Sequence, residues 1–331
     1  MKQHQHTVVI TDCDHGSIDE EKEELGRIGA ELVLAQAKDE TDLIRACKEA
    51  DALIIQYSLL PRTALEQLPK CKALARYGVG VDSIDLKAST DLGIIVANVP
   101  DYCMDEVADQ TVTMILTLIR KAAFFDRRVK SGEWDFHKGT PIHRIKGRTL
   151  GLIGCGKIGL EVAKRISSFG VTVTAFDPYL KKAFEGIELK DFDAVLSESD
   201  FISIHCPLND STRHLIGKRE FNKMKKKPLI INTSRGAIID EAALIQALQE
   251  GLISGAGLDV LETEPPGSQN PILEMENVVL SPHVGFYSVE SISELKRRTA
   301  KNVADVLTGA WPGSVVNREV FGKTRATISR H

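Results

Sequence analysis

The sequence lacks the features that mark membrane, secreted and nucleic-acid-binding proteins. No apolar run approaches the roughly 18 residues that a membrane-spanning helix needs, and the N-terminal stretch MKQHQHTVVITD has no apolar signal segment. The net charge is only −4 over 331 residues, so no overall field draws the chain to nucleic acid or to anionic lipid. We therefore expect a cytoplasmic protein with neither a membrane nor a nucleic acid as its direct partner.

Cysteine is also sparse. The chain has 6 cysteines, and no two of them form a C-x-x-C pair. Such scattered positions favour buried free thiols in a reducing compartment over disulfides or a zinc site. The sequence therefore predicts no metal site, and its 43% of hydrophobic residues are sufficient to build ordinary apolar cores.

Glycine, in contrast, occurs in an informative pattern. Between the apolar runs 150–153 and 171–176, three glycines stand in G-x-G-x-x-G spacing at Gly154, Gly156 and Gly159, and a helical pattern follows them. In a dinucleotide site such glycines allow a sharp turn, close approach of the pyrophosphate and tight packing of a helix whose N-terminus attracts phosphate. The alternative is a tight turn without a ligand, but the flanking strands and helix favour a cofactor.

Asp177 closes the second of these apolar runs. A carboxylate at this place can accept hydrogen bonds from an adenosine ribose. Its charge would repel the 2′-phosphate of NADP, and no arginine follows it directly, so we expect NAD. Lys181 and Lys182 lie close enough in the sequence to weaken this argument.

The rest of the chain alternates short apolar runs with amphipathic helical patterns. The alternation fills residues 7–97, where no glycine fingerprint occurs, and it resumes after Asp177. Strands that alternate with helices form parallel sheets covered on both faces. The predicted fold class is therefore α/β, with two doubly wound parallel-sheet domains.

One long helix is predicted over residues 101–125, after the break at Asn98-Val99-Pro100. Its second half is apolar nearly all round, and such a helix is buried on every face. One face would cover its own domain and another a second subunit, so we expect a homodimer; the alternative is a helix enclosed within one chain. Residues 126–148 are basic and irregular, which indicates a surface connector.

Polar residues follow three predicted strands of the second half: Arg235, Glu264 and His283. Ligands bind at the carboxyl ends of strands in open α/β sheets. Each residue alone could be an ordinary surface or capping residue, but beside a dinucleotide fold the three indicate reduction of a 2-keto acid. Arginine can clamp the carboxylate with two parallel bonds. Histidine can give a proton to the developing alkoxide, and glutamate can orient the imidazole and stabilise its protonated form.

A second glycine-containing loop, Tyr77-Gly78-Val79-Gly80, follows the predicted strand 73–75. Its two glycines expose backbone N–H groups that could receive a substrate carboxylate. The alternative is an ordinary glycine turn.

Together these motifs resemble the D-isomer-specific 2-hydroxyacid dehydrogenases over nearly the whole chain. The matching stretches are ARYGVGVDSIDL (75–86), NVPDYCMDEVADQT (98–111), LGLIGCGKIG (150–159), HCPL (205–208), INTSRGAIID (231–240), GLDVLETEPP (257–266) and SPHVGFYS (281–288). The branch that looks most similar contains the C-terminal-binding-protein-like and phosphoglycerate-dehydrogenase-like members, although Phe286 stands where the animal members carry Trp.

The resemblance implies an NAD-dependent enzyme that interconverts a 2-keto acid and a D-2-hydroxy acid, with Arg235, Glu264 and His283 as its catalytic residues. It implies a Rossmann cofactor domain, residues 100–295, inserted into a flavodoxin-like substrate domain, residues 1–99 and 296–331. The implied cofactor contacts are Gly154, Gly156, Lys157, Ile158, Gly159, Asp177, Cys206, Pro207, Thr212, Thr233, Asp259 and Thr111. The implied substrate contacts are Tyr77, Gly78, Val79, Gly80, Arg235 and His283.

Individual roles follow from the same resemblance. Thr233 and Asp259 would meet the nicotinamide end, Cys206 and Pro207 the adenosine side, and Thr111 the phosphates or the nicotinamide. A second hypothesis is an NAD(H)-sensing scaffold, similar to the C-terminal-binding-protein corepressors, that recruits proteins with little turnover. The intact catalytic residues favour the enzyme.

Overall fold

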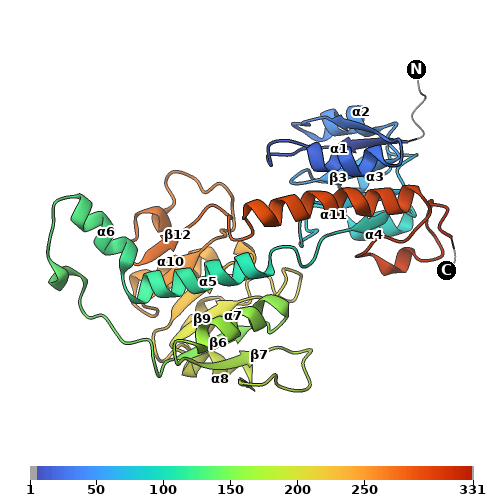
Figure 1. Cartoon of the computed structure of the whole chain (residues 1–331). Helices are drawn as coiled ribbons and strands as arrows, with labels where there is room; N and C mark the ends of the chain where they lie inside the picture. The colour runs from blue at the N-terminus through green and yellow to red at the C-terminus, as the bar shows by residue number, and fades with distance from the viewer. Residues whose placement is uncertain (1–5, 330–331) are drawn as a thin grey trace. The chain divides into compact units, whose positions relative to one another are not determined.

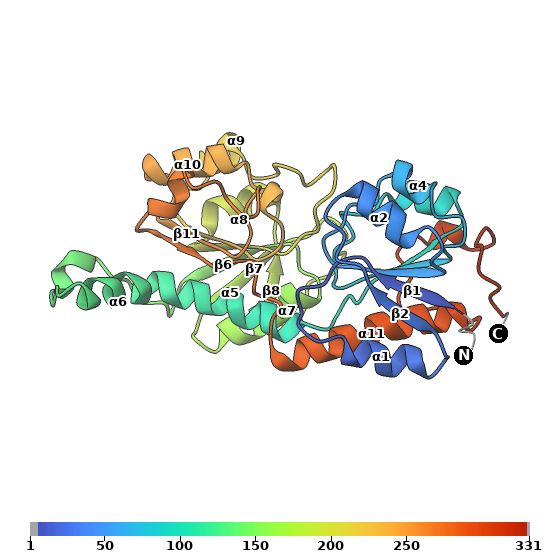
Figure 2. The same cartoon turned by 90° about the horizontal axis from the view of Figure 1, so that it is seen from above.

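The computed structural model describes residues 6–329 and separates the chain into two units (Figures 1 and 2). Unit 1 comprises Met1–Tyr102 and Ser288–His331, and unit 2 comprises Cys103–Tyr287, so unit 2 interrupts unit 1 in the sequence. The second boundary lies before the predicted 295/296 because helix α11 (Val289–Leu307) belongs wholly to unit 1. Residues 1–5, the start of the stretch inspected for a signal segment, lie outside the described residues.

Unit 1 contains a five-stranded parallel sheet in the order β2-β1-β3-β4-β5. Its strands are β1 (Thr7–Ile10), β2 (Glu31–Leu34), β3 (Ala52–Ile55), β4 (Ala73–Arg76) and β5 (Ile95–Ala97). Its helices are α1 (Asp19–Gly26), α2 (Glu40–Cys47), α3 (Arg62–Leu65), α4 (Leu86–Asp91) and α11. Helices α1 and α11 lie on one face, and α2 and α4 lie on the other (Figure 2). This is the doubly wound order of flavodoxin-like folds, whose direction reverses between β1 and β3.

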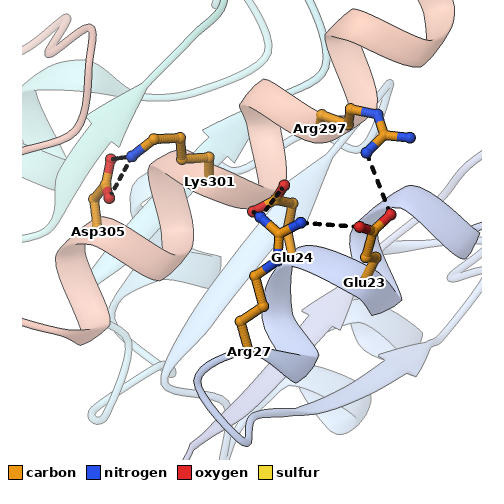
Figure 3. Close-up of polar contacts among 6 residues, drawn as sticks. All are labelled: Glu23, Glu24, Arg27, Arg297, Lys301 and Asp305. Carbon is orange, nitrogen blue, oxygen red and sulfur yellow. Dashed lines mark hydrogen bonds and ion pairs between the residues drawn. The ribbon is translucent and has the colours of Figure 1, made fainter.

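Helix α11 joins unit 1 through an apolar stripe. Ile292, Leu295 and Val303 are buried, whereas Arg297 and Lys301 face solvent. Figure 3 shows exposed charge pairs on α1 and α11, including Arg297 with Glu23 at 3.2 Å. Exposed ion pairs contribute only about 0–1 kcal/mol each, so the buried stripe provides most of the attachment.

Unit 2 contains a seven-stranded parallel sheet in the order β12-β11-β10-β9-β6-β7-β8. Its strands are β6 (Thr149–Ile153), β7 (Thr172–Phe176), β8 (Ile187–Leu189), β9 (Phe201–Ile204), β10 (Leu229–Asn232), β11 (Gly255–Leu258) and β12 (Val278–Leu280). Its helices are α5 (Met104–Ile119), α6 (Ala122–Lys130), α7 (Lys157–Ser167), α8 (Phe192–Glu198), α9 (Lys218–Phe221) and α10 (Glu241–Gln249). The strand order reverses between β6 and β9, and such a switch point is where open α/β sheets bind ligands. The prediction of two doubly wound parallel sheets is confirmed.

The single long helix predicted over residues 101–125 is wrong. Helix α5 ends at Ile119, and α6 begins at Ala122. Lys121 stands between them in the left-handed conformation with φ 53°, which no right-handed helix can contain. The two helices also differ in burial, because α5 buries a row of apolar side chains and α6 buries none.

Residues 6–329 lack two kinds of feature. None of their helices has the length and apolar character that crossing a bilayer requires. Within the same residues, no three His, Cys, Asp or Glu side chains gather where a metal ion could be held.

Candidate active site

The glycine turn lies at the switch point of unit 2. Gly154, directly after β6, has φ +90°, and a Cβ there would lie 2.7 Å from the backbone nitrogen of Cys206. A Cβ on Gly159 would lie 2.8 Å from the Gly154 carbonyl oxygen. A Cβ on Gly156 would instead project into open space. The first and third glycines therefore allow close packing within the protein, while the second leaves room for a ligand.

Helix α7 begins immediately after this turn, at Lys157. Its N-cap is Gly156, which supplies no side-chain hydrogen bond. The first N–H groups of a helix have no partner within the helix and carry a partial positive charge. The turn thus combines an uncapped helix N-terminus with an open approach, a combination that fits the pyrophosphate of a dinucleotide.

Asp177 lies beside the turn, after β7. Its carboxylate accepts hydrogen bonds from the Cys155 N–H at 3.0 Å and the Tyr179 N–H at 2.9 Å. These bonds fix a negative charge next to the glycines. The position fits the predicted contact with an adenosine ribose.

The loop after β9 forms the other side of the switch point. The His205 N–H donates to the Ile153 carbonyl at 2.8 Å, and Thr212 Oγ1 donates to the Pro207 carbonyl at 2.6 Å. Burial raises the pKa of the Cys206 thiol to about 11, so this cysteine is protonated at neutral pH and is not a nucleophile.

His205 was not among the predicted site residues. Its Nε2 lies 2.8 Å from Ser203 Oγ, and burial lowers the pKa of its imidazole to about 4, so the ring is neutral at pH 7. The HCPL motif contains this histidine, but the sequence does not indicate that the side chain turns back onto its own strand.

The structure brings Arg235, Glu264 and His283 to one rim of the unit 2 sheet. They follow the neighbouring strands β10, β11 and β12. His283 Nδ1 lies 2.7 Å from Glu264 Oε2, and the other oxygen of Glu264 accepts the Leu261 N–H at 3.0 Å. Arg235 Nη1 donates to the Ser234 carbonyl at 2.8 Å. With Nδ1 facing Glu264, Nε2 is the ring nitrogen of His283 that can exchange a proton with a ligand.

Glu264 remains ionised in this arrangement. Burial alone would raise the pKa of its carboxyl group, but the hydrogen bonds from His283 and the Leu261 N–H, together with the charge of Arg235, outweigh burial and lower the pKa. A carboxylate that stays charged can orient the imidazole and stabilise its protonated form. The ring edge of His283 also meets Phe286, with centroids 6.2 Å apart.

Asp259 is buried and bound to the loop that follows β12. Its carboxylate is 3% exposed and accepts hydrogen bonds from Ser281 Oγ at 2.5 Å, the Val284 N–H at 2.9 Å and the Gly285 N–H at 2.8 Å. Both carboxylate oxygens are therefore engaged with the loop that carries His283. The structure places Asp259 as the anchor of this loop, and its backbone carbonyl also accepts the His283 N–H at 2.8 Å.

This anchoring matters because His283 has a positive φ of 52°. A non-glycine residue in that conformation costs on the order of 1–3 kcal/mol and persists only where its surroundings enforce it. The four bonds to Asp259 supply that constraint. The imidazole is thus held in place by its backbone as well as by Glu264.

Thr111 lies next to Thr233. It is fully buried on α5, and its hydroxyl donates to the Val107 carbonyl and meets Thr233 Oγ1 at 2.9 Å. The Thr111 side chain therefore supports Thr233, and its contact with a cofactor stays a prediction. Thr233, which is partly exposed, keeps its place at the end of β10.

The loop at residues 77–80 lies at the end of β4 in unit 1. Val79 is 38% exposed, but the Tyr77 side chain is only 2% exposed, so Tyr77 can offer a substrate only its backbone. Gly78 has φ +132°, and the Arg76 guanidinium covers its Cα so closely that a Cβ would collide with Nη1. The loop therefore combines a cation with backbone that only glycine can adopt.

Comparison with known proteins agrees with this geometry. Residues 112–285 match the model of the D-isomer specific 2-hydroxyacid dehydrogenase family, NAD binding domain. The chain is 38% identical to the D-3-phosphoglycerate dehydrogenase of Methanocaldococcus jannaschii over 328 residues, which cover 96% of this chain and 62% of that protein. It is also 38% identical to the glyoxylate reductase of Korarchaeum cryptofilum over 285 residues, or 84% of this chain and 86% of that one.

Solved structures give the same result. The glyoxylate reductase of Paecilomyes thermophila has a TM-score of 0.86 with 28% identity, covering 96% of this chain and 99% of its own. D-lactate dehydrogenase with NAD+ from Lactobacillus jensenii has a TM-score of 0.76 with 28% identity, covering 94% and 99%. The fold and the site thus define an NAD-dependent oxidoreductase with a Rossmann domain. The chain belongs to the D-isomer-specific 2-hydroxyacid dehydrogenase family.

Proposed function

We propose that the chain reduces a small 2-keto acid to the D-2-hydroxy acid, and catalyses the reverse reaction, with Arg235, Glu264 and His283 as its catalytic residues. The 2.7 Å contact between His283 Nδ1 and Glu264 Oε2, on the rim that also carries Arg235, is the observation that supports this most directly. Bound NADH would supply the hydride. Binding, orientation and proton transfer would be carried out by side chains and backbone groups of this chain.

Arg235 is suited to hold the substrate. Its bond to the Ser234 carbonyl keeps the guanidinium at the rim. A planar guanidinium binds a carboxylate through two parallel hydrogen bonds, and its charge polarises the neighbouring carbonyl. Arg235 therefore both selects a carboxylate and prepares the carbonyl carbon for reduction.

His283 is suited to transfer the proton. During reduction its Nε2 gives a proton to the oxygen that becomes the hydroxyl, and in the reverse direction the same nitrogen removes it. Glu264 fixes the ring through Nδ1 and stabilises the charged imidazolium. The backbone N–H groups of the loop at 77–80 would receive the substrate carboxylate.

The preferred cofactor is NAD over NADP, because the fixed charge of Asp177 beside the glycine turn disfavours a 2′-phosphate. The structure restricts the identity of the substrate less than that of the cofactor. The Arg76 guanidinium at the loop adds a cation that suits a second anionic group, whereas the exposed Val79 and Tyr287 suit a small unphosphorylated acid. A scaffold function is not favoured, because the catalytic residues are complete.

We further propose a homodimer formed through unit 2. Helix α6 buries none of its residues, and the segment after it exposes Trp134 to 89% and Phe136 to 65%. Exposed aromatic side chains concentrated on one segment are typical of protein interfaces. Light scattering should give twice the chain mass of 36.4 kDa; a monomer at micromolar concentration would contradict the proposal. A cytoplasmic location fits the six free cysteines.

The test of activity is a panel assay. The protein is mixed with NADH or NADPH and with glyoxylate, hydroxypyruvate, phosphohydroxypyruvate, pyruvate or a branched 2-keto acid, and nicotinamide absorbance is followed. Turnover of at least one acid, faster with NADH, is expected. Tight NADH binding without turnover of any acid would support the scaffold instead.

A further inference from the structure

The tyrosine of the 77–80 loop points into unit 1, away from the loop surface. Its hydroxyl donates a 2.6 Å hydrogen bond to Glu21 Oε1 on α1. Tyr77 is 2% exposed and Glu21 is fully buried. The Tyr77 ring also meets the edge of His15, with ring centroids 5.4 Å apart. Tyr77 is therefore an internal anchor at the first residue of the loop.

The partner of this anchor is an unusual group to bury. Glu21 Oε2 accepts no hydrogen bond within residues 6–329, and its near cation is Lys296 Nζ at 3.9 Å. Burial raises the pKa of the Glu21 carboxyl group. Burying charged groups is costly, and apolar residues of similar size are often at least as stabilising. Stability alone therefore gives a weak reason for a glutamate here.

Lys296, on α11, completes the arrangement. It is 3% exposed, and its ammonium donates to Glu20 Oε2 at 2.6 Å and to the Ser17 carbonyl at 2.5 Å. These bonds hold the start of α1, and hence Glu21, at a fixed place. The exposed pair between Arg297 and Glu23 joins the same two helices at the surface, where screening by solvent makes it weaker (Figure 3).

The carbonyl groups of the loop are tied from the opposite side. The Val99 N–H donates to the Gly78 carbonyl at 3.0 Å, and Asn98 Nδ2 donates to the Val79 carbonyl at 2.6 Å. Within residues 6–329 the backbone N–H groups of Val79 and Gly80 donate to no protein acceptor. The loop thus has two of its carbonyl acceptors occupied and two of its N–H donors open, and open N–H donors are what an anion requires.

We propose that Glu21, held by Lys296, is a positioning residue for the substrate: it fixes Tyr77 so that the N–H groups of Val79 and Gly80 stay aligned for the substrate carboxylate. The inference rests on the proposed function, because it assigns a task to the loop in that reaction. Glu21 touches neither substrate nor cofactor and acts through Tyr77.

The test uses three variants of the full chain. Tyr77→Phe removes the donor, Glu21→Gln keeps an oxygen acceptor without the charge, and Ser89→Ala removes a fully buried hydroxyl elsewhere in unit 1. We expect Tyr77→Phe to raise KM for the 2-keto acid about tenfold while kcat and the Kd for NADH stay within about twofold. In Glu21→Gln the KM should stay close to that of the wild type. Ser89→Ala should leave KM, kcat and the Kd for NADH unchanged.

Amide hydrogen exchange provides a readout independent of turnover. Exchange at residues 78–81 should be faster in Tyr77→Phe than in the wild type or in Ser89→Ala. If KM and loop exchange were the same in Tyr77→Phe as in Ser89→Ala, with only the melting temperature lowered, the pair would be structural and the proposal overturned. A wild type without turnover would contradict the proposed function, while faster loop exchange in Tyr77→Phe alone would still support the anchor.

Discussion

The two parallel sheets of this chain differ in whether the N–H groups at the switch point are open or occupied. In unit 2 the turn between β6 and α7 has open space at Gly156 and an uncapped helix N-terminus. In unit 1 the corresponding place, between β1 and β3, holds the carboxylate of Asp12. The Asp12 carboxylate accepts the Tyr57 N–H at 2.6 Å, the Ser58 N–H at 3.2 Å and Ser58 Oγ at 2.6 Å.

This difference teaches that a doubly wound sheet offers an anion site only if its own residues leave the N–H groups open. In unit 1 an internal carboxylate occupies the N–H groups of Tyr57 and Ser58 at the switch point. Open N–H groups appear instead two strands away, after β4, in the loop at 77–80. The same fold class can thus serve as a cofactor domain or as a domain suited to a smaller anion.

The largest expected effect concerns the rim of unit 2. His283→Ala should lower kcat about 10²- to 10⁴-fold, because the proton donor is lost. His214→Ala is the matched control, since His214 also pairs with a carboxylate, Glu262, on the β11 loop but lies outside the catalytic residues. Its kcat should stay within about twofold. Steady-state kinetics with saturating NADH measures kcat in both variants. An equal loss of kcat in both would contradict a catalytic role specific to His283.

The second prediction compares two glycines. Gly156→Ala should bind NADH about 10- to 100-fold more weakly, because its methyl group would stand where the pyrophosphate approaches, while the protein itself has open space there. Gly16 in unit 1 also has open space, but its φ is +83°. Gly16→Ala should therefore cost about 1 kcal/mol of stability and leave NADH binding intact.

Calorimetric titration measures the NADH affinity of both variants, and thermal melting measures their stability. Opposite signatures are expected: lost affinity without lost stability at Gly156, and the reverse at Gly16. Unchanged NADH affinity in Gly156→Ala would show that the cofactor does not approach over this glycine.

The smallest effect is expected from Asp12→Ala, which leaves the donors of Tyr57 and Ser58 without their acceptor. The free energy of unfolding at pH 7 should fall by about 1–3 kcal/mol. Burial would raise the pKa of Asp12, but hydrogen bonds from Ser58, Thr11 and the Tyr57 N–H lower it overall. A lowered folded-state pKa stabilises the protein above the unfolded value of about 4 and loses that effect as the pH falls through the folded value.

The difference between the wild type and Asp12→Ala should therefore be largest above about pH 5 and shrink in acid. Urea unfolding at several pH values measures it. A difference that does not change with pH would mean that Asp12 acts through packing and not through its charge.

Much of the fold could be predicted because its signals are local. Apolar runs alternating with helical patterns identify parallel sheets, and the glycines identify their turn by backbone geometry alone. Arg235, Glu264 and His283 could be placed on one rim, because the carboxyl ends of parallel strands lie together.

The remaining features depend on which partner a side chain meets in three dimensions. The break at Lys121 is set by a single backbone angle in a sequence that otherwise favours helix. Asp259 and Thr111 occur at positions of the family pattern, but the sequence does not show that they form hydrogen bonds with residues 281–285 and with Thr233. Tyr77 belongs to a loop motif, but its ring is buried beside Glu21. The spacing of residues in the sequence does not predict that contact.

The interruption of unit 1 by unit 2 has a consequence for biosynthesis. Helix α11 packs on α1, and Asn317 Oδ1 accepts the Val96 N–H at 2.8 Å, so residues near the C-terminus complete unit 1. Domains fold as units while the ribosome adds about 5–20 residues each second. The cofactor domain can therefore finish folding first, while one face of the sheet formed by the N-terminal hundred residues is covered by α1 alone until α11 has been synthesised. A nascent chain arrested at Tyr287 should bind NADH yet leave its N-terminal residues sensitive to protease.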